Sequence, residues 1–358
     1  MKVLLICPAL PDDMPYLRHY LDYLDCHSVI YDLTYLCRCN EDVQYPTNYY
    51  RYNVPIKSQQ GTVNKLRVNY KYSRFVINKL SKGNYTHVIT MGIACSVFLS
   101  YFLKKKFPSK YIYDIRDYSQ VLRIPIFRYL NEELLKHSHM NVISSGGFKS
   151  WLPNGLDYTL CHNTTLECLN KAERQNVDKI HTNPIRILTI GQIRDFEVNS
   201  YIIEQFSNNN NYELFFSGKG TTLDSLEDFV KEKEYKNVKF TGRYKKEEED
   251  RIAESATFIN VCMGSNMISD YLLSNRLYLA ARLRKPLISF DGCYQAEIIK
   301  KYKLGVIIGR TDNFPTAIEK YIGTIDYELF ADGCANFLYS VMRDLKGFSN
   351  KLDDLFVN

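Results

Sequence analysis

Short, continuous runs of apolar residues alternate with amphipathic segments along most of the chain. Lys2–Cys7 (KVLLIC) is the first such run, and residues 185–190 and 212–217 repeat the pattern in the second half. Runs of this length that are rich in Ile, Leu and Val are typical of parallel strands covered on both faces. The other predicted strands are 28–33, 85–91, 110–114, 140–144, 158–162, 238–241, 257–262, 287–290 and 305–308. The pattern predicts two successive α/β units of the Rossmann-like kind.

Segments with helical periodicity follow most of these strands. The predicted helices are 15–25, 61–82, 93–106, 125–137, 195–206, 245–256, 269–284, 295–301 and the region from about 325. Residues 37–60 are irregular and rich in Tyr, Asn and Pro, and we interpret them either as an acceptor-side loop or as a plain surface loop. The polar stretch after residue 163 has no sheet pattern. We therefore expect four parts: an N-terminal domain 1–165, a linker 166–183, a C-terminal domain 184–325, and a helical segment 326–358 that returns to the first domain.

Composition narrows the possible functions. The chain has 358 residues, 45% of them hydrophobic, and a net charge of +6, which suits anionic substrates or an anionic membrane better than dedicated nucleic-acid binding. Its ten cysteines have no zinc-like spacing and no secretory segment precedes the first strand, so reduced thiols in the cytoplasm are expected. No apolar run approaches the roughly 18 residues that span a bilayer. The sequence has no D-x-D motif in a suitable turn and no cluster of metal ligands, so it predicts no metal site.

Two glycine turns in the second half form a candidate anion site. Gly191 follows the strand 185–190 and precedes Arg194, and Gly218-Lys219 ends the strand 212–217. Asp195 is placed to cap the predicted helix 195–206. Ligands of parallel sheets bind at the carboxyl ends of the strands, where the free amides of helix N-termini attract anions. A diphosphate is the natural ligand of such a pair of turns. The alternative is that these are ordinary strand-to-helix turns with solvated cations.

Charged residues also crowd the end of a strand in the first half. The strand 110–114 runs into Asp114-Ile115-Arg116-Asp117-Tyr118. Asp117 could act as a base or orient an acceptor hydroxyl, and Arg116 could contact phosphate. A salt bridge between aspartate and arginine is the competing interpretation.

The predicted helix 93–106 combines aromatic residues with cations. Phe98, Tyr101 and Phe102 stand just before Lys104-Lys105-Lys106. This combination suits peripheral contact with an anionic membrane. The alternative is a solvated helix end whose aromatic rings face the core. The turn after the first strand lacks the G-x-G-x-x-G pattern, which argues against an NAD enzyme.

Several strings also resemble a known family. VISSGGFKSWLP, IRILTIGQIRDFEVN, YELFFSGKG, NVKFTGRY and LLSNRLYLAARLRKPLIS are similar to those of bacterial capsular and exopolysaccharide glycosyltransferases related to the family-four GT-B enzymes. The resemblance covers about 114–308. It implies the GT-B fold, in which two Rossmann-like domains face each other across a cleft. It also implies metal-independent, hexosyltransferase-type transfer of a sugar from a nucleotide sugar, with a UDP-sugar expected, to a saccharide or polyprenyl-linked oligosaccharide at the cytoplasmic face of the membrane.

The resemblance assigns roles to residues already singled out. Gly191 and Arg194 fall on the turn that holds the donor diphosphate, and Gly218 and Lys219 fall on the second such turn. Asp117 falls on the polar position near the acceptor.

The chain departs from the family pattern in the donor site. Asn275 and Arg276 match the Asn-Lys pair of a donor-contacting string, but the acidic residue that ends this string and binds ribose is Leu279 here. Asp270 is the nearest substitute for a second missing carboxylate. These departures leave open a non-catalytic partner in a polysaccharide assembly complex. A nucleotide-sugar 2-epimerase of the same fold is the other alternative, although no set of acidic and His residues suited to C2 chemistry is evident.

Overall fold

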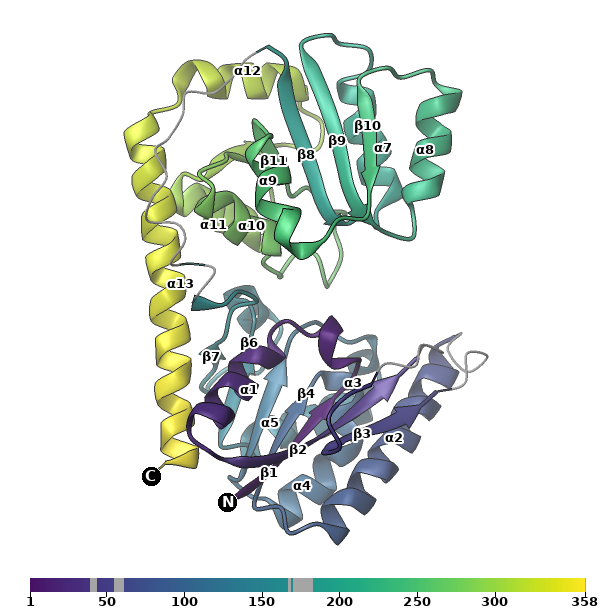
Figure 1. The fold of residues 1–358 in the computed structure, drawn as a ribbon, viewed down its shortest axis with the longest axis vertical. Helices are drawn as coiled ribbons and strands as arrows, with labels where there is room; N and C mark the ends of the chain where they lie inside the picture. The colour runs from purple at the N-terminus through teal and green to yellow at the C-terminus, as the bar shows by residue number, and fades with distance from the viewer. Residues whose placement is uncertain (39–43, 55–60, 167–168, 170–182, 358) are drawn as a thin grey trace. The chain divides into compact units, whose positions relative to one another are not determined.

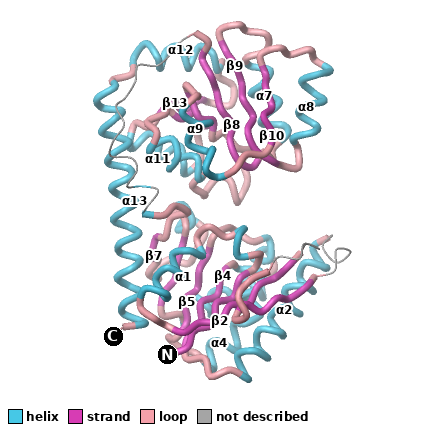
Figure 2. Tube along the Cα trace, viewed as in Figure 1, coloured by secondary structure: helices cyan, strands magenta, loops and turns pink. Residues whose placement is uncertain are grey.

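The computed structural model describes residues 1–38, 44–54, 61–166, 169 and 183–357. The chain forms two compact units, Met1–Thr165 with Arg343–Asn358 and Leu166–Met342. The long helix α13 (Tyr327–Phe356) begins in the second unit and ends in the first (Figure 1). Each unit is a parallel sheet covered by helices, so the predicted α/β class is confirmed. Figure 2 shows the strands of each unit side by side in magenta.

The first unit contains a seven-stranded sheet in the order β3-β2-β1-β4-β5-β6-β7. The strands are β1 Lys2–Cys7, β2 Ile30–Cys37, β3 Tyr49–Asn53, β4 His87–Met91, β5 Tyr111–Ile115, β6 Met140–Ile143 and β7 Thr159–Leu160. The central strands are buried almost throughout, which explains their continuous apolar runs. Edge strand β3 lies in the segment predicted to be irregular, so that prediction was wrong for 49–53, while 39–43 and 55–60 lie outside the described residues. Its sequence, YYRYN, is only partly buried and therefore carries no apolar run.

Helices cover both faces of this sheet. They are α1 Leu17–Cys26, α2 Thr62–Lys82, α3 Ile93–Ser96, α4 Ser100–Lys106 and α5 Pro125–His137, with short 3₁₀ turns η1 Pro11–Asp13, η3 Val97–Leu99, η4 Gln120–Arg123 and η5 Gly146–Ser150. Helices α2 to α5 pack against one another on one face, as right-handed crossovers require. Helix α1 packs on the other face with the end of α13, where the ring of Tyr20 meets Phe348 edge-on and the Tyr23 hydroxyl donates to Asp353.

The second unit contains a six-stranded sheet in the order β10-β9-β8-β11-β12-β13. The strands are β8 Ile185–Gln192, β9 Tyr212–Lys219, β10 Val238–Gly242, β11 Phe258–Asn260, β12 Leu287–Phe290 and β13 Gly305–Ile308. The helices are α7 Phe196–Gln205, α8 Leu223–Glu232, η7 Lys246–Glu248, α9 Glu249–Glu254, α10 Asn275–Arg282, α11 Tyr294–Tyr302 and α12 Phe314–Thr324. Rings of Phe206, Phe258 and Phe314 fill the core of this unit.

One helix starts later than the sequence indicates. The amphipathic pattern predicted a helix over 269–284, but α10 begins at Asn275. The Asn266 side chain accepts hydrogen bonds from the amides of Ile268 and Ser269 and so closes a turn there. Ser274 is extended, and its hydroxyl accepts from the Arg276 amide as the N-cap. Among the described residues no helix is both long enough and apolar enough to cross a membrane.

Candidate functional site

The two predicted glycine turns lie against each other at the carboxyl ends of β8 and β9. Gly191 pairs with Gly218, and the Ile193 amide donates to the Lys219 carbonyl at 2.9 Å. Both glycines have positive φ, 94° for Gly191 and 143° for Gly218. A Cβ atom on Gly218 would lie 1.9 Å from the Gly191 carbonyl oxygen. The two turns can therefore approach this closely only because Gly218 has no Cβ atom, and at Gly191 the positive φ favours glycine.

A third glycine serves the same close approach. A Cβ atom on Gly220 would lie 1.6 Å from the Ile193 carbonyl oxygen. The Thr222 hydroxyl donates to this same oxygen at 3.1 Å, and it makes no capping bond to α8. Packing of the two turns therefore requires glycine at positions 218 and 220, whatever ligand binds there.

The cations predicted beside these turns are exposed. The Arg194 Nε atom donates to the Gln192 side chain at 3.1 Å, and Lys219 lies at the surface at the end of β9. In the part of the chain that the structure describes, neither residue forms a salt bridge. Both positive charges are accessible to an anion from solvent.

Arg276 supports the first glycine turn from inside the unit. Its guanidinium donates to the carbonyl oxygens of Ile190 at 2.6 Å, Gln192 at 3.0 Å and Asn260 at 3.0 Å. Burial lowers its pKa to about 10. Among the described residues no carboxylate pairs with this arginine. Arg276 thus ties the start of α10 to the ends of β8 and β11 and adds positive charge to that edge. Its neighbour Asn275 is exposed.

The two positions at which the chain departs from the family pattern have clear surroundings. Asp270 lies in the turn that precedes α10, where one carboxylate oxygen accepts from the Ser265 hydroxyl at 2.9 Å. Its backbone carbonyl accepts from the Tyr294 amide at 2.8 Å. Leu279 is buried, with 6% of its surface exposed. This position on α10 therefore offers apolar packing and no carboxylate.

The sequence reasoning missed a cavity of about 500 Å³ at the same edge of this sheet. It is lined by Asp195, Glu197, Val198, Tyr201, Gly264, Ser265, Asn266, Phe290 and Arg310. Asp195 was predicted only as the cap of α7, and it does accept from the Val198 amide while also accepting from the Gly264 amide. The Arg310 guanidinium stacks 4.6 Å from the Phe290 ring centroid. The Gly-Arg pair after β13 was the available signal, since every strand in the sheet ends at this edge.

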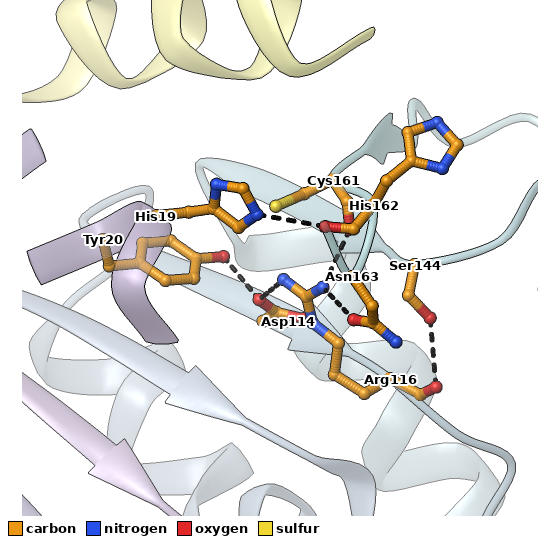
Figure 3. Close-up of polar contacts among 8 residues, drawn as sticks. All are labelled: His19, Tyr20, Asp114, Arg116, Ser144, Cys161, His162 and Asn163. Carbon is orange, nitrogen blue, oxygen red and sulfur yellow. Dashed lines mark hydrogen bonds and ion pairs between the residues drawn. The ribbon is translucent and has the colours of Figure 1, made fainter. Parts of the chain in front are cut away.

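The charged cluster predicted in the first unit surrounds a buried ion pair (Figure 3). Arg116 donates to both oxygens of Asp114, each at 2.6 Å, and the Tyr20 hydroxyl donates to the same carboxylate at 2.6 Å. The guanidinium also donates to the Cys161 carbonyl at 2.8 Å and to the Asn163 side chain at 3.0 Å. Burial, and after it the Asp114 charge, raises the pKa of Tyr20 well above its usual value, so the phenol stays protonated.

These contacts bear on the roles expected of Arg116 and Asp117. Arg116 is 6% exposed, and its guanidinium lies 4.1 Å from the Tyr16 ring centroid. The contacts favour the salt bridge with Asp114 over a phosphate contact. Asp117 follows β5 at the carboxyl edge of the sheet and is exposed. Its acceptor-side role stays a prediction.

Two histidines extend this network toward α13. The Nε2 atom of His19 lies 3.1 Å from the His162 carbonyl oxygen, and that of His162 lies 3.2 Å from an Asp344 carboxylate oxygen. Burial and, after it, the Arg116 charge lower the pKa of His19 to about 4. His19 is therefore neutral at physiological pH and donates from Nε2. The sequence could not group these residues because they come from α1, the end of β7 and α13.

The helix proposed for membrane contact is mixed in character. The Phe98 ring packs against Tyr70 and Phe127, and the Phe102 ring packs against Phe107. For these two rings the structure favours the alternative of packing toward the interior. Tyr101 is 73% exposed, and Lys104 pairs with Glu133 at 2.5 Å. No group of three or more His, Cys, Asp or Glu residues suited to a metal ion occurs among the described residues.

Comparison with known proteins identifies the fold. No family profile and no curated protein sequence matches the chain. Sucrose-phosphate synthase from Thermosynechococcus elongatus matches with a TM-score of 0.69 at 11% identity, over 99% of this chain and 98% of that chain. Anabaena Alr3699/HepE in complex with UDP matches with a TM-score of 0.65 at 10% identity, over 99% and 100%. The chain has the GT-B fold.

A third structure agrees. WaaG, a glycosyltransferase involved in lipopolysaccharide biosynthesis, matches with a TM-score of 0.63 at 13% identity over 100% of both chains. The GT-B fold predicted from the family resemblance is thereby confirmed. At these identities the likeness shows the fold alone.

Proposed function

We propose that the protein is a glycosyltransferase that moves a sugar from a nucleotide-sugar donor to a saccharide acceptor. The observation that carries this proposal is the pair of glycine turns on β8 and β9, with Arg194 and Lys219 exposed beside them. Arg276 adds a charge that no carboxylate among the described residues neutralises. Three cations and a helix N-terminus at one sheet edge are suited to a diphosphate.

The electrostatic terms are large enough to matter. Free amides at the start of α7 favour an anion by roughly 0.3–2 kcal/mol. A cation 4 Å from a phosphate contributes about 4 kcal/mol before desolvation, at an effective dielectric constant of 20. During transfer the same groups stabilise the charge that develops on the leaving diphosphate. This arrangement supports a transfer that does not require a metal ion.

A UDP-sugar is the donor we propose. Anabaena Alr3699/HepE, which has this fold, has been solved with UDP and with UDP and glucose. Because Leu279 provides no carboxylate for the ribose, the ribose contacts fall to Asp270 and backbone groups in this proposal. The expected consequence is weaker or differently selective nucleotide binding than in relatives that keep the acid.

We further propose that Asp117 serves the acceptor, as a base or by orienting a hydroxyl. Its exposure at the end of β5 supports this, since the adjoining Asp114–Arg116 pair gives the turn a rigid base. The proposed acceptor is a growing capsular or exopolysaccharide glycan, polyprenyl-linked, at the cytoplasmic membrane face. The involvement of WaaG in lipopolysaccharide biosynthesis agrees with a lipid-linked glycan as acceptor.

Nucleotide binding tests the donor site. UDP, GDP, CDP, dTDP and their sugar conjugates are titrated into the purified protein by calorimetry. Arg194→Ala and Lys219→Ala should each weaken binding of the preferred nucleotide by more than about tenfold, or about 1.4 kcal/mol. Lys320→Ala is the matched control, because Lys320 is an exposed lysine on α12. Unchanged affinity in both site variants would refute the diphosphate assignment.

The buried Leu279 favours one alternative, a non-catalytic member of a polysaccharide assembly complex. Release of nucleoside diphosphate separates the two functions. A glycosyltransferase releases it in proportion to added acceptor, and Asp117→Asn should lower that rate at least a hundredfold. A non-catalytic partner binds the nucleotide sugar without turnover across the acceptor panel.

A further inference from the structure

A long part of the first unit carries basic residues and no acidic ones. Between Asp42 and Asp114 the sequence contains neither Asp nor Glu. The basic residues from position 61 to 113 are Lys65, Arg67, Lys71, Arg74, Lys79, Lys82, Lys104, Lys105, Lys106 and Lys110. The chain as a whole has 46 basic and 40 acidic residues, so this segregation is local. It marks one region of the protein as strongly positive.

The fold gathers this region into one helical layer. Helix α2, the α3–η3–α4 segment and the η4–α5 segment pack side by side over the same face of the seven-stranded sheet. The Tyr70 ring of α2 lies 5.9 Å from that of Phe98 in η3, and Phe98 lies 5.1 Å from Phe127 in α5. The η4–α5 segment adds Arg123 and Arg128 before its first acid, Glu132. We call the outer surface of these segments the basic layer.

Most cations of the basic layer face solvent. Within the described residues, no salt bridge involves Lys65, Arg67, Lys71, Arg74 or Arg123. The acids of α5 are confined to its second half, where Glu133 pairs with Lys104 and Lys136. The start of α5 and the outer side of α2 therefore keep their positive charge.

Large apolar side chains are exposed among these cations. Of the thirteen exposed large hydrophobic residues in the described chain, six belong to the basic layer: Val63, Tyr70, Tyr101, Ile124, Ile126 and Tyr129. Ile126 is 57% exposed and Tyr129 is 55% exposed, on the first turns of α5. The mixture of cations with exposed aliphatic and aromatic residues is concentrated on a single face of the unit.

We infer that the basic layer docks on the surface of an anionic lipid bilayer. The charge complementarity is to lipid phosphates, and the tyrosines suit the boundary between headgroups and acyl chains. Lysine and arginine side chains can lie along that boundary with their charges in the headgroups. Exposed isoleucines decide against a nucleic acid, because a polyphosphate backbone offers them no apolar environment. The observations behind this docking all come from the first unit and do not use the proposed donor site. The docking surface uses α2 and α5 rather than α4 alone.

Vesicle binding tests this inference. The full chain is sedimented with vesicles of phosphatidylcholine alone and of phosphatidylcholine with about one phosphatidylglycerol in three. We expect at least about tenfold tighter binding to the anionic vesicles and loss of that preference at high salt. The double variant Lys71→Glu/Arg74→Glu should lose at least about tenfold in affinity for anionic vesicles. Lys236→Glu/Lys320→Glu, the same charge change in the second unit, should bind as the wild type does.

The apolar contribution is tested separately. Ile126→Ser/Tyr129→Ser keeps every charge and should weaken binding to anionic vesicles at least about threefold. Circular dichroism verifies that each variant is folded, as expected for changes at exposed positions. Equal binding to neutral vesicles, wild-type binding by either basic-layer variant, or capture of transfer RNA without capture of vesicles would each overturn the inference. Nucleotide titration of the same samples reports on the second unit, so failure of docking is distinguishable from failure of the proposed transferase function.

Discussion

The buried ion pair of the first unit should be a major determinant of its stability. Arg116→Met removes the guanidinium and leaves the Asp114 carboxylate, which is 0% exposed, with the Tyr20 hydroxyl as its remaining partner in Figure 3. Removing one member of a buried pair costs about 3–5 kcal/mol, because the other charge stays desolvated. The carbonyl of Cys161 and the Asn163 side chain also lose a donor. We expect the free energy of unfolding to fall by about 4 kcal/mol.

Urea and thermal unfolding measure this loss. For units of this size 1 kcal/mol corresponds to about 2–4 °C, so the midpoint should fall by about 8–16 °C. The double variant Asp114→Asn/Arg116→Met removes both charges and should recover part of the loss, with a coupling energy above about 2 kcal/mol. Arg18→Met is the control, because Arg18 is 74% exposed and lies 4.0 Å from Asp22; it should cost less than about 0.5 kcal/mol.

Two results would refute the reasoning. A loss below about 1 kcal/mol for Arg116→Met would mean that the pair is not a buried structural element. No coupling between the two positions would mean that the carboxylate does not depend on the guanidinium. A catalytic role for Arg116 would regain support if Arg116→Lys kept the stability and abolished nucleoside diphosphate release.

Three further predictions concern the glycine turns, Arg276 and His19. Gly218→Ala should destabilise the second unit by more than about 2 kcal/mol in urea, because its Cβ would meet the Gly191 carbonyl, whereas Gly323→Ala, which meets nothing within 4 Å, should be neutral or slightly stabilising. Arg276→Lys should lower the thermal midpoint by about 4–12 °C, because one ammonium cannot span the three carbonyl oxygens that the Arg276 guanidinium holds. An unchanged midpoint would contradict this stabilising role of Arg276. Burial depresses the pKa of His19 to about 4 from an ordinary 6.5, so the unfolded chain takes up the proton first and stability is lost as pH falls through that window. The free energy of unfolding should therefore differ between pH 7 and pH 4, and His19→Gln should remove about 2–3 kcal/mol of that difference. A pH dependence of unfolding identical to that of the wild type would contradict this.

Local pattern predicted the parts of the fold in which burial is uniform. Strand β1 is buried from Val3 to Cys7, and β8 is buried from Ile185 to Ile190 except at Arg186, so both are short runs rich in Ile and Leu that can be read without knowing their neighbours. Asp195 was recognised as a cap because the capping bond to Val198 spans three residues. Edge strand β3 escaped prediction because pairing with β2 holds it in place, rather than an apolar face of its own.

Roles of side chains in the candidate site could be predicted from the sequence only where their partners lie close along the chain. The glycine turns were found because each is a local signal at a strand end. Arg116 was ambiguous because its acceptors on Cys161 and Asn163 follow β7, and the Tyr20 hydroxyl that shares the Asp114 carboxylate comes from α1. Arg276 matched a donor-contacting string, yet two of its three acceptors, on Ile190 and Gln192, lie more than eighty residues earlier. The local sequence therefore does not show that Arg276 holds the ends of β8 and β11 together.

The sequence by itself determined the α/β class, the order of most strands and helices, and the positions at which cations follow strand ends, since these follow from short-range burial and turn chemistry. Only the tertiary structure decided which of those cations remain accessible. Arg194 and Lys219 stay at the surface, whereas Arg116 and Arg276 are engaged by carboxylate and carbonyl oxygens from distant segments. The physical reason is that a charge is defined chemically by its own residue, but its availability depends on every group that folding brings within hydrogen-bonding distance.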